Sequence, residues 1–200
     1  RLQQYEKLMK AIVAHHEISA SGSPLESNQA ERIADAASKT LGTLVGTLLG
    51  AYVTTDDVED ASEPDAPDDI ISFKVKMSLR MSVDDYDRTQ NDLKELVLLR
   101  NNLVHHFIDQ HDLWSLDGCR DAHDSLVSAY SRIDQHFEQL RGWAEHMDQA
   151  RRLAAEFAQS DAFRDLVING IAPDGSVDWP AAGIVRVLRE ADAELAIEGW

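Results

Sequence analysis

Apolar residues recur every three or four positions along four long stretches of the chain, and this spacing predicts amphipathic helices. The stretches cover residues 1 to about 20, about 24 to 53, about 83 to 108 and about 115 to 147. Four helices with a long connection after the second are typical of an antiparallel bundle. The pattern therefore predicts an all-α fold in which residues 1–149 form an antiparallel four-helix bundle.

The hydrophobic pattern changes to strict alternation between residues 70 and 83. A period of two indicates a β-strand, and a single strand leaves backbone groups unpaired. We therefore predict a β-strand or hairpin insertion between the second and third helices, which folds on itself, pairs with another part of the chain or pairs with a second copy. Its polar face carries Lys74, Lys76 and Arg80, which form either a solvated face or a wall that contacts phosphate.

Three glycines of the predicted second helix, Gly42, Gly46 and Gly50, lie four residues apart. Each costs helix stability relative to alanine, and such a track lets another backbone approach closely. That backbone belongs to the same bundle or, alternatively, to a second copy. The segment that follows, residues 54–69, contains eight acids and no bases, which predicts a solvated loop.

Residues 150–200 contain shorter apolar groups and predict a small helical unit at the C-terminal end. Within it, Gly175-x-Val177 and the Leu188-Arg189 pair resemble the opening of a helix-turn-helix domain of the OST-HTH/LOTUS kind, a family linked to RNA. The alternative is a helical appendage that packs on the fourth helix.

Composition limits the possible functions. Apolar residues make up 44% of the chain, but no apolar run reaches the roughly 20 residues needed to span a bilayer, so we expect no membrane association. The single Cys119 excludes an internal disulfide and favours a cytoplasmic location. The net charge of −17 has the wrong sign for nonspecific binding of nucleic acid. Any function on RNA must therefore depend on a local cationic site, on removal of the acidic segment from the groove, or on a partner.

The third predicted helix combines an apolar stripe with polar groups. The stripe consists of Leu93, Leu96, Val97, Leu103, Val104 and Phe107. Arg100 falls inside this stripe and keeps its charge, so it needs partners. At about 100° per residue, His105 lies about 140° around the helix from Arg100, with Asn101 between them. One helix thus carries a permanent cation, an amide and a titratable imidazole, which suits work on a phosphate group.

This Arg100-Asn101-x-x-x-His105 pattern resembles the signature of the HEPN superfamily (higher eukaryotes and prokaryotes nucleotide-binding). The family signature is an arginine and a histidine separated by four to six residues, most commonly with asparagine directly after the arginine. His106 satisfies a spacing one residue longer. The resemblance implies an all-α bundle of about this size, a metal-independent endoribonuclease activity, and pairing of two copies so that both motifs line one cleft.

We therefore predict a catalytic group of Arg100, Asn101 and His105. Arg100 would hold the scissile phosphate, His105 would move a proton, and Asn101 would orient His105 or hold a phosphate oxygen. The predicted substrate-binding residues are Lys74, Lys76, Arg80, Asn102 and His106. We expect no cofactor and no metal, because no third and fourth ligand follow His105 and Asp109 at the usual spacings.

The expected partners are RNA and a second copy of the chain, and a protein antitoxin or regulator is a further option. Two alternatives remain open. Arg100 and His105 could instead serve a structural ion pair or cap with Glu95, Asp109 or Asp134. The acidic charge favours a non-catalytic helical module, either a binding or regulatory unit for RNA or nucleotide or a member of a toxin–antitoxin pair.

Overall fold

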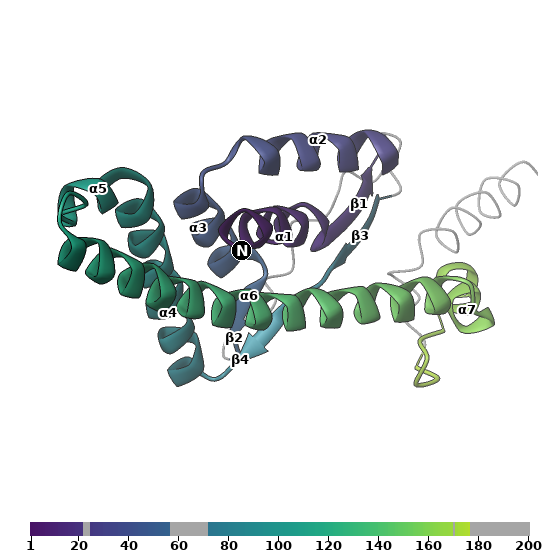
Figure 1. The fold of residues 1–200 in the computed structure, drawn as a ribbon. Helices are drawn as coiled ribbons and strands as arrows, with labels where there is room; N and C mark the ends of the chain where they lie inside the picture. The colour runs from purple at the N-terminus through teal and green to yellow at the C-terminus, as the bar shows by residue number, and fades with distance from the viewer. Residues whose placement is uncertain (22–24, 57–71, 170, 177–200) are drawn as a thin grey trace, which may run out of the picture. The chain divides into compact units, whose positions relative to one another are not determined.

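The computed structural model describes residues 1–21, 25–56, 72–169 and 171–176. This part of the chain is mostly helical with a few short strands (Figure 1), which confirms the all-α prediction at that coarse level. Several predictions lie outside the described residues: most of the acidic segment, Val177 and Leu188-Arg189 of the helix-turn-helix resemblance, and the side chain of Lys74.

The chain divides into two compact units, Arg1–Met147 and Asp148–Trp200. The division lies inside the long helix α6, Leu116–Ala158, as does the predicted boundary between residues 149 and 150. In the second unit, α7 spans Asp161–Asn169, and the rings of Phe157 and Phe163 meet edge to face with their centroids 5.6 Å apart.

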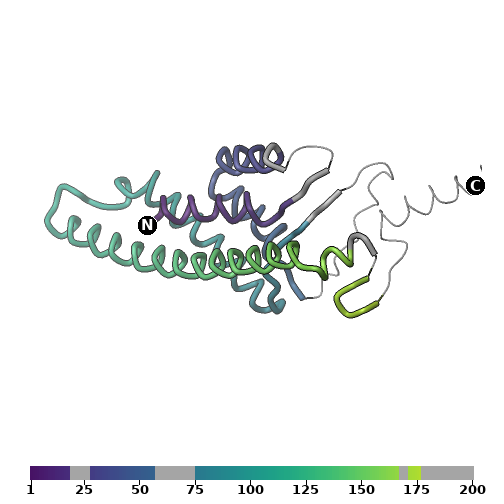
Figure 2. The backbone as a smooth tube through the Cα atoms, turned by 90° about the vertical axis from the view of Figure 1, so that its right-hand side faces the viewer, coloured from purple at the N-terminus to yellow at the C-terminus, as the bar shows by residue number. Residues whose placement is uncertain are grey.

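Helix α1, Leu2–His15, contributes one buried side to the core of the first unit. The side chains of Tyr5, Met9 and Ile12 are almost completely excluded from solvent, and burial raises the pKa of the Tyr5 hydroxyl. Helix α1 lies between α2, Leu25–Ser38, and α6 in both ribbon views (Figures 1 and 2). The apolar stripe seen in the sequence therefore becomes the centre of the core.

The predicted second helix is in fact two helices, α2 and α3, the latter spanning Leu41–Ala51. Thr40 separates them with an extended backbone (φ −74°, ψ 162°) and caps α3, because its Oγ1 accepts the backbone N–H of Thr43 at 3.4 Å. The prediction of one helix from residue 24 to 53 was wrong. In a sequence, a capping threonine marks the end of a helix much less clearly than a glycine or a proline does.

The alternating stretch forms two strands that pair with other parts of the chain. Strand β3, Ser72–Lys76, pairs antiparallel with β1, Glu17–Ser21. Strand β4, Leu79–Met81, pairs parallel with β2, Val53–Thr55. A hairpin is therefore excluded for these residues, and pairing with other segments of the chain is confirmed. The prediction that the first helix continues to residue 20 was also wrong, because residues 17–21 provide the partner that β3 needs.

The glycine track does not bring a second backbone of the described chain close. A Cβ atom on Gly42 would meet only Val97 Cγ1, at an ordinary 3.7 Å, and one on Gly46 or Gly50 would meet nothing within 4 Å among the described residues. Close approach within the bundle was therefore a wrong prediction at Gly46 and Gly50. Approach by a second copy stays a prediction.

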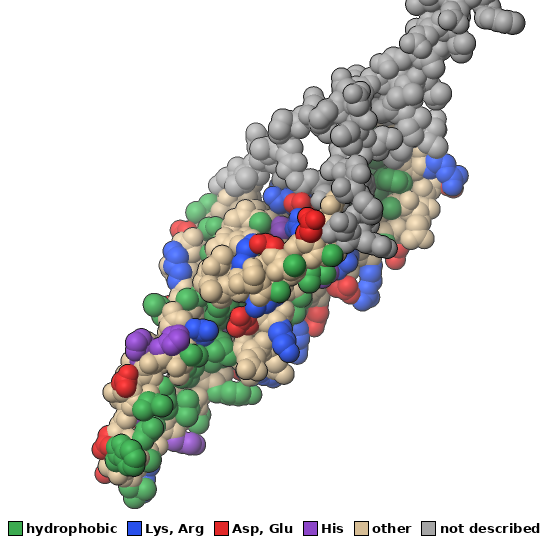
Figure 3. Space-filling model, turned by 90° about the horizontal axis from the view of Figure 1, so that it is seen from above, with side chains coloured by type: hydrophobic (Ala, Val, Ile, Leu, Met, Phe, Trp, Pro, Cys, Tyr) green, Lys and Arg blue, Asp and Glu red, His purple; other side chains and the backbone are tan. Residues whose placement is uncertain are grey.

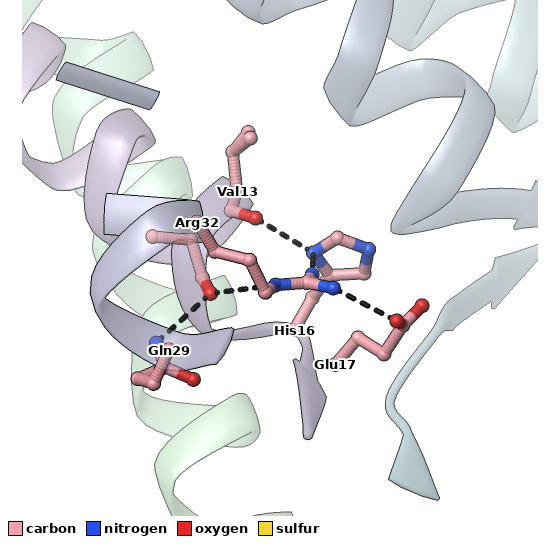
Figure 4. A network of polar contacts seen from close by, with 6 residues as sticks. Val13, His16, Glu17, Gln29 and Arg32 are labelled. Carbon is pink, nitrogen blue, oxygen red and sulfur yellow. Dashed lines mark hydrogen bonds and ion pairs between the residues drawn. The ribbon is translucent and has the colours of Figure 1, made fainter. Parts of the chain in front are cut away.

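A polar network fixes the corner between α1 and β1 (Figure 4). His16 is only 6% exposed, and its Nδ1 donates to the carbonyl oxygen of Val13 at 2.8 Å. Arg32 of α2 pairs with Glu17 at 2.8 Å. Burial lowers the pKa of His16, although the bond to Val13 partly opposes this. The corner is therefore built around a neutral imidazole.

This neutral imidazole makes stability depend on pH. The pKa of His16 is lowered in the folded chain and near 6.5 in the unfolded chain, so the unfolded state binds protons more readily in weak acid. The contribution of neutral His16 to the free energy of unfolding is therefore fully present above about pH 6.5. It is lost as the pH falls through the lowered pKa of the folded chain. We expect His16→Gln to lower the free energy of unfolding by about 1–2 kcal/mol at pH 8, and to lose less stability between pH 7 and 5 than the unsubstituted protein.

Urea unfolding at several pH values measures this difference. His146→Gln removes an exposed histidine of α6 and controls for loss of an imidazole in general. A pH dependence of His16→Gln that equals that of the unsubstituted protein would contradict the assignment.

Candidate active site

Helix α4, Val83–Asn101, carries two of the predicted catalytic residues, Arg100 and Asn101, at its C-terminal end. Ser82 caps its N-terminal end, because Ser82 Oγ accepts the backbone N–H of Asp85 at 3.2 Å. Leu93 and Leu96 are 2% and 0% exposed and anchor the helix in the core. The polar residues that follow are therefore presented by a firmly held helix.

The helix changes character where the motif lies. Residues Asn102–His106 form a π-helical segment, η1, and Phe107–Gln110 continue as α5. In a π-helix the hydrogen bonds join residues i and i+5, and such segments often occur at functional sites. The prediction of one regular helix to residue 108 was therefore wrong at the motif itself.

The wider turn brings Arg100 and His105 together. Their Nη1 and Nε2 atoms are 3.4 Å apart, whereas a regular α-helix would separate the two residues by about 140° around its axis. Arg100 Nη1 also donates to Asn101 Oδ1 at 3.2 Å. Arg100 and Asn101 are half-buried and His105 is exposed. The three predicted catalytic residues thus form one cluster that reaches solvent through His105.

Two of the three carboxylates named in the structural alternative have other partners. Glu95 pairs with Arg132 at 2.9 Å, and Asp134 pairs with Arg1 at 2.6 Å. Among the residues that the structure describes, no carboxylate lies within ion-pair distance of Arg100. An internal ion pair to Glu95 or Asp134 is therefore not the role of Arg100.

The two neighbouring polar residues of the motif segment lie at different places. His106 is exposed and meets the ring of His105 edge to face, with centroids 6.3 Å apart. Asn102 is exposed and lines a groove toward Arg132 of α6. His106 therefore lies beside the candidate cluster, and Asn102 belongs to the adjoining groove.

The basic residues of the strand segment lie far from this cluster within one chain. Lys76 and Arg80 are exposed at the β3–β4 end of α4, and Lys74 belongs to β3. Helix α4 contains 19 residues and is therefore about 28 Å long at about 1.5 Å per residue. Figure 1 shows β4 and α5 at opposite ends of α4. A phosphate-binding wall beside Arg100 would have to come from a second copy.

A compact turn joins α5 to α6 beyond the cluster. Asp112 Oδ1 accepts the backbone N–H of Trp114 at 3.1 Å, and Ser115 Oγ accepts that of Gly118 at 3.1 Å, which caps the beginning of α6. The hydrogen bond with the Ser115 side chain is the main reason why the pKa of Asp112 is lowered. A Cβ atom on Gly118 would lie 1.9 Å from the carbonyl oxygen of Asp112. Glycine is therefore needed for the turn to close against α6.

This turn presents large apolar side chains to solvent, a feature that sequence periodicity did not single out. Trp114 is 100% exposed, and Ile108 and Leu116 are 74% and 70% exposed. Figure 3 shows hydrophobic side chains grouped on this face, with histidine side chains beside them. The turn is thus an apolar surface a few residues along the chain from the candidate cluster.

The described ranges offer neither a metal site nor a membrane-spanning helix. No group of three or more His, Cys, Asp or Glu side chains suited to a metal ion occurs there. No helix in the described ranges has the length and apolar character to cross a membrane.

The chain matches no protein-family model, no curated protein and no solved structure.

The close contact at Gly118 predicts opposite outcomes for one substitution at two places in α6. Gly118→Ala places a methyl group against the Asp112 backbone, and we expect it to destabilise the first unit by about 1–3 kcal/mol. Gly142→Ala meets nothing within 4 Å among the described residues and should instead stabilise α6, by up to about 1 kcal/mol. Thermal and urea unfolding of both variants measure the contrast; equal shifts of the same sign would contradict the geometry of the turn.

Proposed function

We propose that this protein is a metal-independent endoribonuclease of the HEPN type, with an all-α HEPN-like bundle, that acts as a homodimer. The observation that carries the proposal is the 3.4 Å approach of Arg100 Nη1 to His105 Nε2 on the π-helical turn. The residues that match the HEPN signature in the sequence therefore lie next to one another in the structure. The freedom of Arg100 from carboxylates, within the described residues, supports a role toward an external anion.

Arg100 is suited to the phosphate that is cleaved. A guanidinium presents several N–H groups in a planar fork and binds two phosphate oxygens at once. During attack on phosphorus, negative charge builds up on these oxygens, and a fixed cation stabilises that charge. Asn101 accepts a hydrogen bond from Arg100 and therefore holds the guanidinium in place.

His105 is suited to proton transfer. In the proposed reaction the ribose 2′-oxygen attacks phosphorus and forms a new P–O bond, while the bond to the 5′-oxygen breaks. The 2′-hydroxyl proton passes to a base, and an acid donates a proton to the leaving 5′-oxygen. The products are a 2′,3′-cyclic phosphate end and a 5′-hydroxyl end, without a metal or a cofactor. An exposed imidazole can serve as either the base or the acid.

Two copies are proposed because one cluster supplies one arginine and one active histidine, whereas the reaction uses a base and an acid. A symmetric pair brings the same surface of both copies together, so both clusters can line one cleft. Leu98, Val104 and Ile108 near the motif are 63%, 55% and 74% exposed. These apolar side chains offer a surface that a second copy would cover.

The first test of the proposal is loss of cleavage. Arg100→Ala removes the charge that stabilises the transition state, and His105→Ala removes a proton carrier. We expect each to reduce the rate of RNA cleavage by a factor of about 10² or more while the fold is retained. The rate is measured with fluorescent RNA oligonucleotides in the presence of a chelator, and circular dichroism checks the fold.

Matched controls are available on α6. Arg120 and His123 are exposed, and neither belongs to the cluster. Arg120→Ala and His123→Ala should therefore cleave like the unsubstituted protein. Undiminished cleavage by the Arg100→Ala/His105→Ala double variant would exclude the proposed site.

The second test addresses the shared cleft. A heterodimer of one Arg100→Ala copy and one His105→Ala copy retains one intact arginine and one intact histidine. We expect it to recover part of the activity, above that of either homodimeric variant, because the shared cleft then holds an arginine from one copy and one of the two histidines from the other. Co-expression with two different affinity tags and two-step purification isolates the heterodimer. A monomeric active protein in analytical ultracentrifugation would contradict the shared cleft.

A non-catalytic binding module is the second candidate, and the fully exposed Trp114 in a fixed turn is the observation that favours it. Exposed aromatic residues on rigid supports are common centres of protein interfaces. For such a module, purified protein would cleave no RNA under any condition, and Arg100→Ala or His105→Ala would alter only stability or dimer affinity.

A further inference from the structure

A groove on the α4–α6 side of the catalytic cluster has no role in the reaction described above. It has a volume of about 220 Å³ and runs between the α4–η1–α5 segment and the first half of α6. Figure 2 shows these two segments extending side by side past the beginning of α1. Its apolar wall is formed by Leu99, Leu103, Phe107 and Ala129. The volume is below the range of about 300–1,000 Å³ that is common for drug-sized ligands, so it suits a single ring system.

Four polar side chains face this groove: the amides of Asn102 and Gln110 and the hydroxyls of Ser125 and Ser128. No hydrogen bond engages any of these four side chains among the residues that the structure describes. Amides and hydroxyls both donate and accept hydrogen bonds. The groove therefore combines an apolar wall with hydrogen-bond donors and acceptors that have no partner among the described residues.

The charge of the groove argues against an anionic ligand. Arg132 lines it, but Glu95 pairs with Arg132 at 2.9 Å. The local charge is thereby balanced, and a phosphate would have to compete with Glu95. A neutral ligand with flat apolar faces and a hydrogen-bonding edge fits better, and nucleobases have this chemistry.

The groove also lies beside the catalytic cluster along the chain. Asn102, which lines it, directly follows Asn101, which holds Arg100. We propose that this groove binds one base of the RNA strand next to the cleaved phosphate and so gives the enzyme a base preference. Asn102 and Gln110 contact the base edge, and Phe107 contacts its face. This inference rests on the proposed nuclease function for the identity of its ligand.

One substitution fills the groove and a matched one does not. Ser128→Phe places a ring in the groove, and Ser131→Phe makes the same change three residues further along α6 at an exposed position that does not line it. Asn102→Ala removes a base contact without adding volume. The full chain and the three variants are titrated with adenosine, guanosine, cytidine and uridine by NMR, and circular dichroism verifies their folds.

We expect at least one nucleoside to bind the unsubstituted protein and the Ser131→Phe control. Binding should weaken by about tenfold or more in Ser128→Phe and Asn102→Ala. Sequencing of the ends from a randomised RNA should show a base preference beside the cut, which Ser128→Phe loses while still cleaving.

The outcomes separate this inference from the proposed function. Nucleoside binding that Ser128→Phe abolishes, in a protein that cleaves no RNA, supports the groove and rejects the nuclease. Cleavage whose base preference is unchanged in Ser128→Phe and Asn102→Ala rejects the groove and leaves the nuclease standing. Binding of inorganic phosphate without any nucleoside also overturns the inference.

Discussion

Burial of the apolar side of α1 is the constraint on which the first unit depends. Tyr5, Met9 and Ile12 are almost fully excluded from solvent, and complete burial of one such side chain contributes about 1.5–3 kcal/mol. The same core includes Leu93 and Leu96 of α4 and Leu140 of α6. Because α4 and α6 both contact this core, their positions relative to each other are determined there.

The candidate site lies where these two helices extend past the core. Leu96 is completely buried, whereas Val104, two turns further on, is 55% exposed. Beyond that point α5 and α6 are held by their own contacts, chiefly by the glycine turn at Gly118 and by the small buried residues Ala122 and Ala129. Such a projection can carry an irregular π-helical turn at modest cost, because the core does not impose a regular spacing on it. Arg100 and His105 thus meet where the buried part of α4 ends and the exposed η1 turn begins.

Local signals were predictable from the sequence, and long-range ones were not. The α4 stripe depends on residues within a few positions of one another, and its members Leu93 and Leu96 are buried as expected, whereas Val104 is exposed. Strand β1 could not be predicted at the end of the first helix, because its partner β3 lies more than fifty residues away. The motif residues were identified, but their mutual approach was not, since a π-helical turn leaves no mark on a hydrophobic pattern of period 3.6.

The net charge of −17 and the proposed RNA substrate can be reconciled by how cations are paired. Arg32, Arg88 and Arg132 each pair with a carboxylate, so their charge is balanced locally. Arg100 instead contacts an amide and an imidazole, two groups that do not cancel its charge. A cation without a carboxylate partner in an acidic molecule is a preferred binding site for an anion. The acidic surface around it repels phosphate elsewhere. Two such cations in one cleft would strengthen this contrast, which gives the proposed pairing of copies an electrostatic reason in addition to a catalytic one.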